Sequence, residues 1–272
     1  MATVDQTGLQ TVLALLNDIT SVTRATDRVT FNGTGQTNDL FIGNAGNNIA
    51  RGNAGNDLLL GNDGDDFLSG DTGNDALFGG NGADKLKGGS GNDTIVGSEG
   101  HDLLVGDSGV DQLTGGEGHD QFAYTGDVFA NGIPTPAGQT NINVLNQPDV
   151  ISDFTIGEDK FAFNKFDLDL DNLTFQKGQS SQIAGDGNVI VLTDPFPAAG
   201  AAARAIANND KITADAGAFV YFNSTLGLTR LAYSQDLSDG GDVSVLANLD
   251  NQRGEAGLAN LAKFSAAEFT LV

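Results

Sequence analysis

The chain has 272 residues, no cysteine and a formal net charge of −23 at pH 7. No basic patch is available to neutralise phosphates, which argues against nucleic-acid binding, and a disulfide framework is excluded. Aspartate outnumbers glutamate by 31 to 5, a bias that suits metal ligands carried on short turns better than the acidic surface of helices.

The first predicted element is an amphipathic helix from Thr7 to about Thr23. Its apolar positions recur at helical spacing: Leu9, Val12, Leu13, Leu16, Ile19 and Val22. We expect residues 1–33 to form a helical cap on the solenoid that follows, because solenoids need caps; a self-association helix is the alternative. The longest apolar run nearby, Val12–Leu16, is too short for a signal-peptide core or a membrane span, so neither an N-terminal export signal nor a transmembrane segment is predicted.

A nine-residue repeat organises the next part of the chain. Glycine fills the first place of each unit, at Gly43, Gly52, Gly61, Gly70, Gly79, Gly88, Gly97, Gly106 and Gly115, and again three residues later. The sixth place holds Asp57, Asp66, Asp75, Asp84, Asp93, Asp102, Asp111 and Asp120, with Asn48 in the first unit. The eighth place is apolar, at Ala50, Leu59, Leu68, Leu77, Leu86, Ile95, Leu104, Leu113 and Phe122. A degenerate leading unit from Thr34 adds Asp39 and Phe41, and one register over so many units indicates a solenoid.

Each unit divides into a six-residue turn and a three-residue strand. The glycines, and second-place residues such as Asn53 and Asp71, suit turn positions with positive φ. Side chains alternate along a strand, so the eighth place faces inward while the seventh and ninth face outward. One apolar residue per strand makes a narrow core, and consecutive strands then belong to two opposing sheets. Turns on one side come from every second unit, 18 residues apart in sequence.

This stacking brings the sixth-place carboxylates to roughly 5 Å from one another along each edge of the solenoid. Without neutralisation they would repel. Carboxylates and main-chain carbonyls are hard oxygen donors, and the pattern holds no thiolate and no regular imidazole, so calcium fits better than zinc or copper. We therefore predict that the metal ligands are the eight sixth-place aspartates, Asn48, Asp39 and the carbonyls of the turns at the first-place glycines.

The units resemble the G-G-x-G-x-D-x-U-x nonapeptides of RTX (repeats-in-toxin), hemolysin-type calcium-binding proteins. This resemblance implies an all-β fold built on a right-handed parallel β-roll, or β-solenoid, that holds calcium between successive turns of the same side. Odd units leave four gaps, even units three and the leading unit one more, which gives about seven or eight calcium ions. Asn48 leaves its gap one charge short, so the N-terminal sites should be the weakest.

The glycine period stops after Phe122, and we predict a roll over residues 34–124 and a mixed, mainly β flanking domain over residues 125–272. Predicted strands are Asp149–Phe154, Lys160–Phe163, Leu173–Phe175 and Asn188–Leu192; Ala198–Asn208 reads as a helix, and Ala218–Phe222 with Leu228–Tyr233 as a hairpin. Parts of this region resemble the segment that follows the repeats in RTX proteins. The last residues, ending Glu268-Phe269-Thr270-Leu271-Val272, are similar to uncleaved type I secretion signals; an edge strand is the alternative.

No catalytic motif is recognisable, because the sequence has no His-Glu-x-x-His, no Gly-x-Ser-x-Gly and no phosphate-binding loop. His101 and His119 share the fifth place of odd units, so a transition metal is one alternative to solvent-facing side chains. Aspartate groups of the flank, Asp167, Asp169 and Asp171 or Asp236, Asp239 and Asp242, could be an acid and base pair, but solvated loops or one extra calcium site explain them better. We therefore predict no catalytic residues.

The outward places of the even units include Leu58, Leu60, Ala76, Phe78 and Val96, an apolar strip that the N-terminal helix, the flank or another copy should cover. Without calcium the acidic, glycine-rich repeat should be disordered. We thus expect a secreted, extracellular protein that folds on calcium and acts without catalysis in cell-surface or matrix binding or assembly. A glycan, a second copy and the type I machinery are its candidate partners. The alternatives are an accessory module of an extracellular hydrolase or polysaccharide-modifying enzyme, and a surface-layer array protein.

Overall fold

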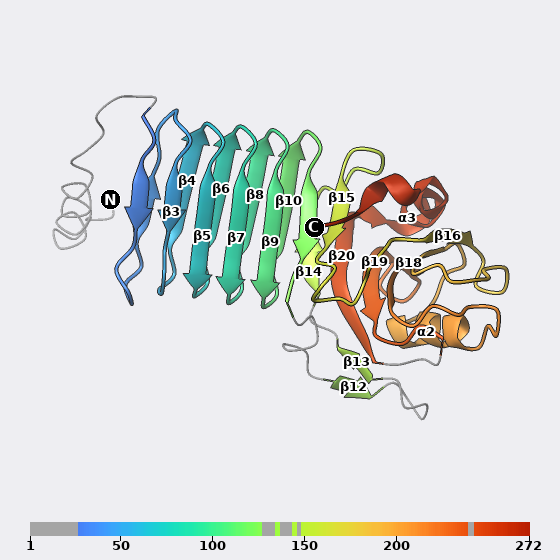
Figure 1. The fold of residues 1–272 in the computed structure, drawn as a ribbon. Helices are drawn as coiled ribbons and strands as arrows, with labels where there is room; N and C mark the ends of the chain where they lie inside the picture. The colour runs from blue at the N-terminus through green and yellow to red at the C-terminus, as the bar shows by residue number, and fades with distance from the viewer. Residues whose placement is uncertain (1–26, 127–133, 137–142, 146–147, 239–241) are drawn as a thin grey trace, which may run out of the picture.

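A computed structural model describes residues 27–126, 134–136, 143–145, 148–238 and 242–272. These residues form an elongated stack of parallel strands that ends in a larger flanking region (Figure 1). The predicted all-β, β-roll class is confirmed. The helix predicted over residues 7–23 lies outside the described residues.

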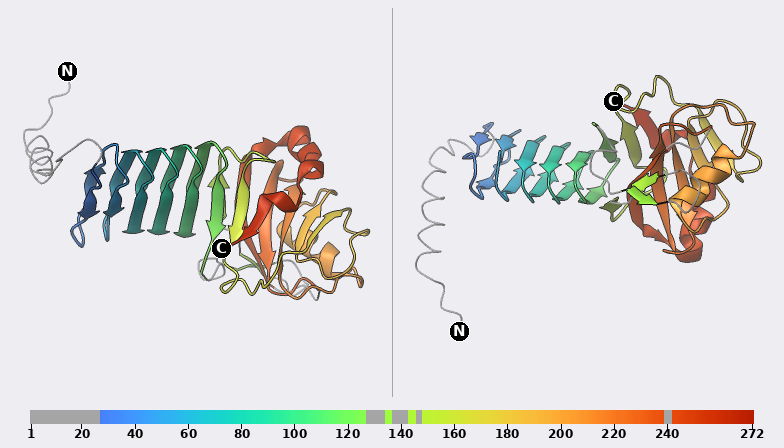
Figure 2. Two further views of the ribbon diagram at one scale, coloured as in Figure 1. Left: turned by 45° about the horizontal axis from the view of Figure 1, so that its top comes forward. Right: turned by 90° about the horizontal axis from the view of Figure 1, so that it is seen from below.

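Two opposing sheets build the roll. One runs in the order β1-β3-β5-β7-β9-β11-β15-β21 and the other contains β14-β10-β8-β6-β4-β2, so consecutive strands alternate between sheets as predicted (Figure 2). The strands of the first sheet are β1 (Thr30–Asn32), β3 (Ile49–Arg51), β5 (Phe67–Thr72), β7 (Lys85–Ser90), β9 (Leu103–Ser108), β11 (Gln121–Tyr124), β15 (Lys160–Phe163) and β21 (Phe269–Leu271). The roll strands of the second are β2 (Leu40–Ile42), β4 (Leu58–Asp63), β6 (Ala76–Asn81), β8 (Thr94–Glu99), β10 (Gln112–Glu117) and β14 (Asp149–Ile151).

From β4 to β10 the strands are six residues long instead of the predicted three. Before the first-place glycine, Leu60 pairs with Phe78. After this glycine the pairing continues with Asn62↔Gly80 and Asp63↔Asn81. The second and third places of each turn therefore belong to the ladder. The physical reason is that main-chain groups on the buried edge need partners, which the equivalent turn 18 residues away supplies.

The core of the roll is the ladder of eighth-place side chains. Leu59, Leu68, Leu77 and Ile95 are fully buried and stack in register, for example Leu59↔Leu77 and Leu77↔Ile95. The flank continues this ladder, because Leu113 pairs with Ile151 and Phe122 with Phe161. Both ends of the roll therefore reach past the predicted limits of 34 and 124: β1 already pairs with β3, and β14 and β15 follow β10 and β11.

Aromatic rings close the C-terminal end of the core. Phe154 stacks on Phe161 with ring centroids 4.4 Å apart and lies 6.0 Å from Phe122 and 5.9 Å from Phe264. The last strand, β21, pairs with β15 and adds Phe269 to this cluster. In the folded chain the C-terminal residues therefore form an edge strand at the end of one sheet.

The flank extends the second sheet through β20, β19, β18, β17 and β16. Its elements are β16 (Phe175–Gly178), β17 (Val189–Leu192), α2 (Ala199–Ala207), β18 (Gly217–Asn223), β19 (Leu228–Ser234), β20 (Val243–Arg253), α3 (Gly254–Asn260), the 3₁₀ turns Leu261–Lys263 and Ala266–Glu268, and the small pair β12 (Pro134–Pro136) and β13 (Asn143–Leu145). The predicted helix and hairpin are confirmed. The longest strand, β20, had not been predicted.

The flank packs against the end of the roll and does not cover the apolar strip of the even sheet (Figure 1). On that sheet Leu58 remains 38% exposed and its neighbour Ile42 remains 43% exposed. Of the three predicted covers for this strip, the flank is thus excluded, because it extends the sheets along the roll axis. Among the described residues, no helix combines the length and apolarity that a membrane span requires.

Candidate metal centre

The turns of the roll combine two backbone features. Second-place residues adopt positive φ, for example 75° at Asn62 and 72° at Asp71, and so do the fourth-place glycines, with 134° at Gly82. First-place glycines do not, so the predicted reason for them was wrong. A Cβ on Gly79 would lie 2.2 Å from Asp84 Oδ2 and 2.8 Å from the carbonyl oxygen of Gly97. Glycine is needed there because oxygens from two turns converge on the position of its missing side chain.

The sixth-place aspartates form two columns, one on each edge of the roll. We call Asp57, Asp75, Asp93 and Asp111 the even column, and Asp66, Asp84, Asp102 and Asp120 the odd column. In both, Oδ1 of each carboxylate accepts the main-chain N–H of the sixth-place residue 18 positions earlier, which is Asn48 for Asp66 and an aspartate for the others. The donor–acceptor distances include 2.7 Å from Asp66 N to Asp84 Oδ1 and 2.8 Å from Asp84 N to Asp102 Oδ1. One carboxylate oxygen therefore joins each turn to the previous one.

The second oxygen is buried and unpartnered. Oδ2 has no hydrogen-bond donor in any of the eight: Asp57, Asp66, Asp75, Asp84, Asp93, Asp102, Asp111 and Asp120. These side chains are at most 3% exposed. A buried carboxylate oxygen without a partner costs on the order of several kcal/mol of free energy, and here the same unpartnered oxygen recurs in eight turns. A ligand that satisfies one oxygen would satisfy all eight.

Burial raises the pKa of these carboxyl groups. The pKa of Asp84 rises from the ordinary 3.8 to about 7, through desolvation first, with the neighbouring Asp102 and Asp66 charges adding to it; the N–H of Asp66 lowers it in part. Desolvation likewise raises the pKa of Asp75 and Asp93 to about 6. A cation beside Oδ2 would reverse this effect, since an opposite charge favours the ionised form.

The donor set fits calcium. Each gap, meaning the space between two turns 18 residues apart, is faced by carboxylate and main-chain carbonyl oxygens, such as Asp66 Oδ2 and the Gly79 carbonyl, each within 2.5 Å of a Cβ placed on Gly61. In the described residues no group of three or more His, Cys, Asp or Glu side chains could hold a metal by itself. Oxygen ligands drawn largely from the main chain are typical of calcium. Bound calcium would supply the missing positive charge in each gap.

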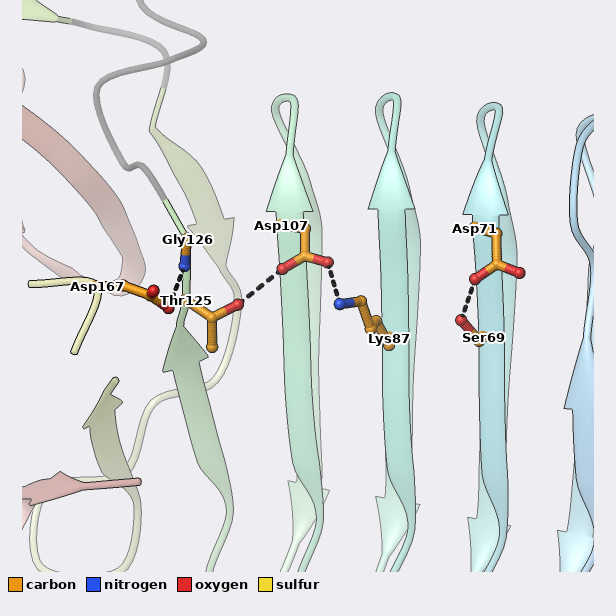
Figure 3. Close-up of polar contacts among 7 residues, drawn as sticks. All are labelled: Ser69, Asp71, Lys87, Asp107, Thr125, Gly126 and Asp167. Atoms are coloured by element: carbon orange, nitrogen blue, oxygen red, sulfur yellow. Dashed lines mark hydrogen bonds and ion pairs between the residues drawn. The ribbon is translucent and has the colours of Figure 1, made fainter. Parts of the chain in front are cut away.

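Aspartates elsewhere in the repeat behave differently, which supports this assignment (Figure 3). On the outer face, Asp71 accepts the Ser69 hydroxyl at 2.6 Å, and Asp107 pairs with Lys87 at 2.8 Å and accepts the Thr125 hydroxyl at 2.9 Å. These second-place carboxylates have partners from the protein. Among the aspartates of the repeat, the sixth place alone combines burial with an unpartnered oxygen.

The two N-terminal candidates lie differently. Nδ2 of Asn48, not its oxygen, faces the gap: it donates to the Gly46 carbonyl and, at 3.5 Å, to the Gly61 carbonyl. In this orientation the amide nitrogen, which cannot coordinate a cation, faces the gap, so the prediction of Asn48 as a calcium ligand gains no support. Asp39 lies partly exposed, and its Oδ2 accepts the N–H of Thr34 at 2.7 Å. The predicted weakness of the N-terminal gaps thus has a structural basis.

The histidines belong to a different ladder. His101 Nδ1 accepts the main-chain N–H of His119 at 2.8 Å. The fifth-place residues of the even units form the same contact, since Asn56 Oδ1 accepts the main-chain N–H of Asn74 at 2.8 Å. The rings stack 5.1 Å apart, and His119 Nδ1 lies 3.0 Å from the Glu158 carbonyl oxygen. Nδ1 of each ring is used in a hydrogen bond, and the transition-metal alternative gains no support. In the flank, Asp167 accepts the N–H of Gly126 at 2.7 Å (Figure 3), and Asp239 lies outside the described residues.

Two aspartates that had not been predicted continue the columns. Asp149 Oδ1 accepts the N–H of Asp111, and Asp159 Oδ1 that of Asp120, both at 3.0 Å. Each is followed two residues later by a buried ladder residue, Ile151 and Phe161. This Asp-x-apolar signal is present in the sequence. It is obscured because the flank has no glycine period and because a segment without the repeat pattern separates Asp149 from the repeats.

The fold and the two columns define a calcium-binding parallel β-roll. Comparison with protein families gives the class a name: four matches to the model of the RTX calcium-binding nonapeptide repeat cover residues 34–68, 51–86, 60–95 and 87–122. Residues 34–122 therefore carry RTX, hemolysin-type calcium-binding nonapeptide repeats. A search of curated proteins found no match.

Proposed function

We propose that this protein is secreted, folds on extracellular calcium and acts without catalysis in binding or assembly at a cell surface or in a matrix. The observation that carries the proposal is the set of eight buried carboxylate oxygens with no partner in the protein. They make calcium part of the fold. Calcium binding by the repeats agrees with the family match.

Folding would depend on calcium because the core of the roll is one side chain wide. Eight buried carboxylates oppose folding when no cation is present, while the ladder offers one apolar residue per strand. Calcium sites of extracellular modules have dissociation constants of about 0.1 to 1 mM, and binding free energy becomes folding free energy. The chain would therefore be unfolded where calcium is scarce, as inside a cell, and would fold outside it.

Export as an unfolded chain fits the C-terminal end. The residues similar to a type I secretion signal include β21, whose strand pairing needs a folded β15. Before folding this segment would be accessible to the secretion machinery. After folding, Phe269 lies 7% exposed against the aromatic cluster, and the segment would be withdrawn.

Binding or assembly is supported by the outer face of the even sheet. Ile42 and Leu58 are exposed large apolar residues on the adjacent strands β2 and β4. In register, Ile42 pairs with Leu60 and Leu58 pairs with Leu40. Such a strip marks a contact surface. A second copy or a cell-surface or matrix glycan held through calcium would be the partner. A carrier module for an extracellular hydrolase and a surface-layer array are the alternatives.

A calcium titration followed by circular dichroism and light scattering tests this proposal. We expect a change from disorder to β signal near millimolar calcium. A constant mass would identify a monomeric binding module, and a mass that rises with calcium would identify assembly. A chain that is already folded in chelator would overturn the proposal, because the flank would then hold the roll without calcium.

A further inference from the structure

The two aspartate columns do not end where the repeats end. The family match stops at residue 122, yet the amides of Asp111 and Asp120 donate to carboxylates of the flank, Asp149 and Asp159. These contacts repeat the geometry inside the roll, where Asp93 N donates to Asp111 Oδ1 at 2.8 Å. The flank therefore supplies one further turn to each column.

The gap in front of each flank turn holds an unpartnered oxygen. Asp111 and Asp120 are 0% and 1% exposed, and Oδ2 of each has no hydrogen-bond donor. The oxygens lie 2.3 Å from a Cβ built on Gly106 and on Gly115. In four preceding turns, those of Gly52, Gly61, Gly79 and Gly97, the same position also meets the carbonyl of the next turn, as Gly97 meets the Gly115 carbonyl at 2.5 Å. By this equivalence the last two unpartnered oxygens face the turns of the flank.

The flank carboxylates differ from those of the repeats in a way that ends the columns. Asp159 Oδ2 accepts the N–H of Thr155 at 2.7 Å, whereas every Oδ2 before it in the odd column, from Asp66 to Asp120, is unpartnered. Neither Asp149 Oδ2 nor Asp159 Oδ2 is among the unpartnered buried oxygens. The series therefore predicts a last gap in each column, and none beyond it.

Tyr124 adds a further group at the even column. It follows the strand pair Ala123↔Val105, so it stands opposite Gly106, where the next first-place glycine would be. Its hydroxyl is buried without a partner. Burial, followed by the charges of Asp149 and Asp111, raises the pKa of Tyr124 well above its ordinary value. The phenol oxygen thus lies near both carboxylates of this gap.

We propose that the last calcium site of each column is shared between repeat and flank: one lies between Asp111 and Asp149, the other between Asp120 and Asp159. This inference rests on the proposed calcium binding by the roll. It assigns one ion to each of the eight unpartnered oxygens and none to the gap that Asn48 closes with its amide. It also gives calcium a second role, because the two shared ions join β14 and β15 of the flank to β10 and β11 of the roll.

Equilibrium dialysis against saturating calcium tests the assignment with Asp149→Asn and Asp159→Asn. The matched control is Asp210→Asn, which removes the same charge from an exposed position of the flank. Wild type and control should bind eight ions, one for each unpartnered oxygen. Each test variant should bind one ion fewer, while circular dichroism shows that the repeats still fold. A folded test variant with the wild-type ion count would overturn the inference.

Hydrogen exchange of the wild type keeps the inference testable if the variants misfold. Peptides covering residues 149–163 should gain protection at the same calcium concentration as those covering residues 93–122. Protection of the flank peptides in chelator, with a calcium effect confined to the repeats, would refute the shared sites and leave the proposed function standing. A wild type that binds no calcium would refute both.

Discussion

Replacing Asp84 with asparagine perturbs the centre of the odd column and tests the role of the buried carboxylates. Asp84 faces two gaps, since Oδ1 accepts the N–H of Asp66 and Oδ2 faces Gly79 and the Gly97 carbonyl. The change therefore removes a charged ligand from two sites. In the variant, an amide nitrogen in place of Oδ2 could donate to a carbonyl, as Asn48 does to Gly61.

The expected loss of stability follows from calcium linkage. One site with a dissociation constant of about 0.5 mM stabilises the folded state by about 1.8 kcal/mol at about 10 mM calcium. Since Asp84 faces two gaps, Asp84→Asn should lower the free energy of unfolding by up to about 3.6 kcal/mol. In chelator the variant and the wild type should not differ, because neither is expected to fold without calcium.

Guanidinium chloride unfolding, followed by circular dichroism with and without calcium, measures both quantities. Asp63→Asn is the control: it carries the same charge change at an exposed position, where Asp63 accepts the Asn81 amide at 2.8 Å. Its free energy of unfolding should change by less than about 0.5 kcal/mol. If the two variants lose equal stability in calcium, the loss reflects net charge and the reasoning about the column is refuted.

Three further predictions concern space, core and pH. Gly79→Ala should raise the calcium concentration at the folding midpoint, since its Cβ would meet Asp84 Oδ2 at 2.2 Å. Gly35→Ala is the control, because nothing lies within 4 Å of its Cβ and the midpoint should stay unchanged. Equal midpoints in the two variants would contradict the convergence of oxygens from two turns at Gly79. Leu77→Ala should cost about 3 to 5 kcal/mol in calcium because Leu77 is fully buried, and Leu226→Ala, at a half-exposed site, should cost far less in the same denaturation assay. Because the folded-state pKa of Asp84 is raised from 3.8 to about 7, folding without calcium takes up protons and becomes less favourable as pH rises from about 4 to 7. The calcium concentration at the folding midpoint should therefore be lower at about pH 5.5 than at about pH 7.5, and a higher midpoint at about pH 5.5 would contradict this assignment.

The periodic part of the fold could be predicted because every unit meets the same environment. Leu77 is buried for the reason that Leu59 and Ile95 are, so one alternation rule placed the whole ladder. The same period placed the aspartate columns. It did not reveal why Gly79 must be glycine, since that depends on oxygens of two turns that approach one another only in the fold.

The alternation rule did not predict the strands at the two ends of the roll. β1 joins the first sheet without a glycine turn before it, and β14 and β15 join through side chains that follow a loop. Asp149 and Asp159 carry the Asp-x-apolar signal, but three residues give little information once the period is lost. β20 was missed because its sequence, VSVLANLDNQR, mixes apolar and polar residues and gains its strand pairing from β19, β14 and β13.

The most direct test of calcium at the buried carboxylates is an anomalous difference map from crystals grown in calcium, recorded at a long X-ray wavelength. We predict one peak beside each of the eight unpartnered Oδ2 atoms, from Asp57 to Asp120. The gap at Asn48 should hold none. A map without peaks along the columns, or with peaks confined to exposed carboxylates such as Asp63, would contradict the view that calcium is part of the fold.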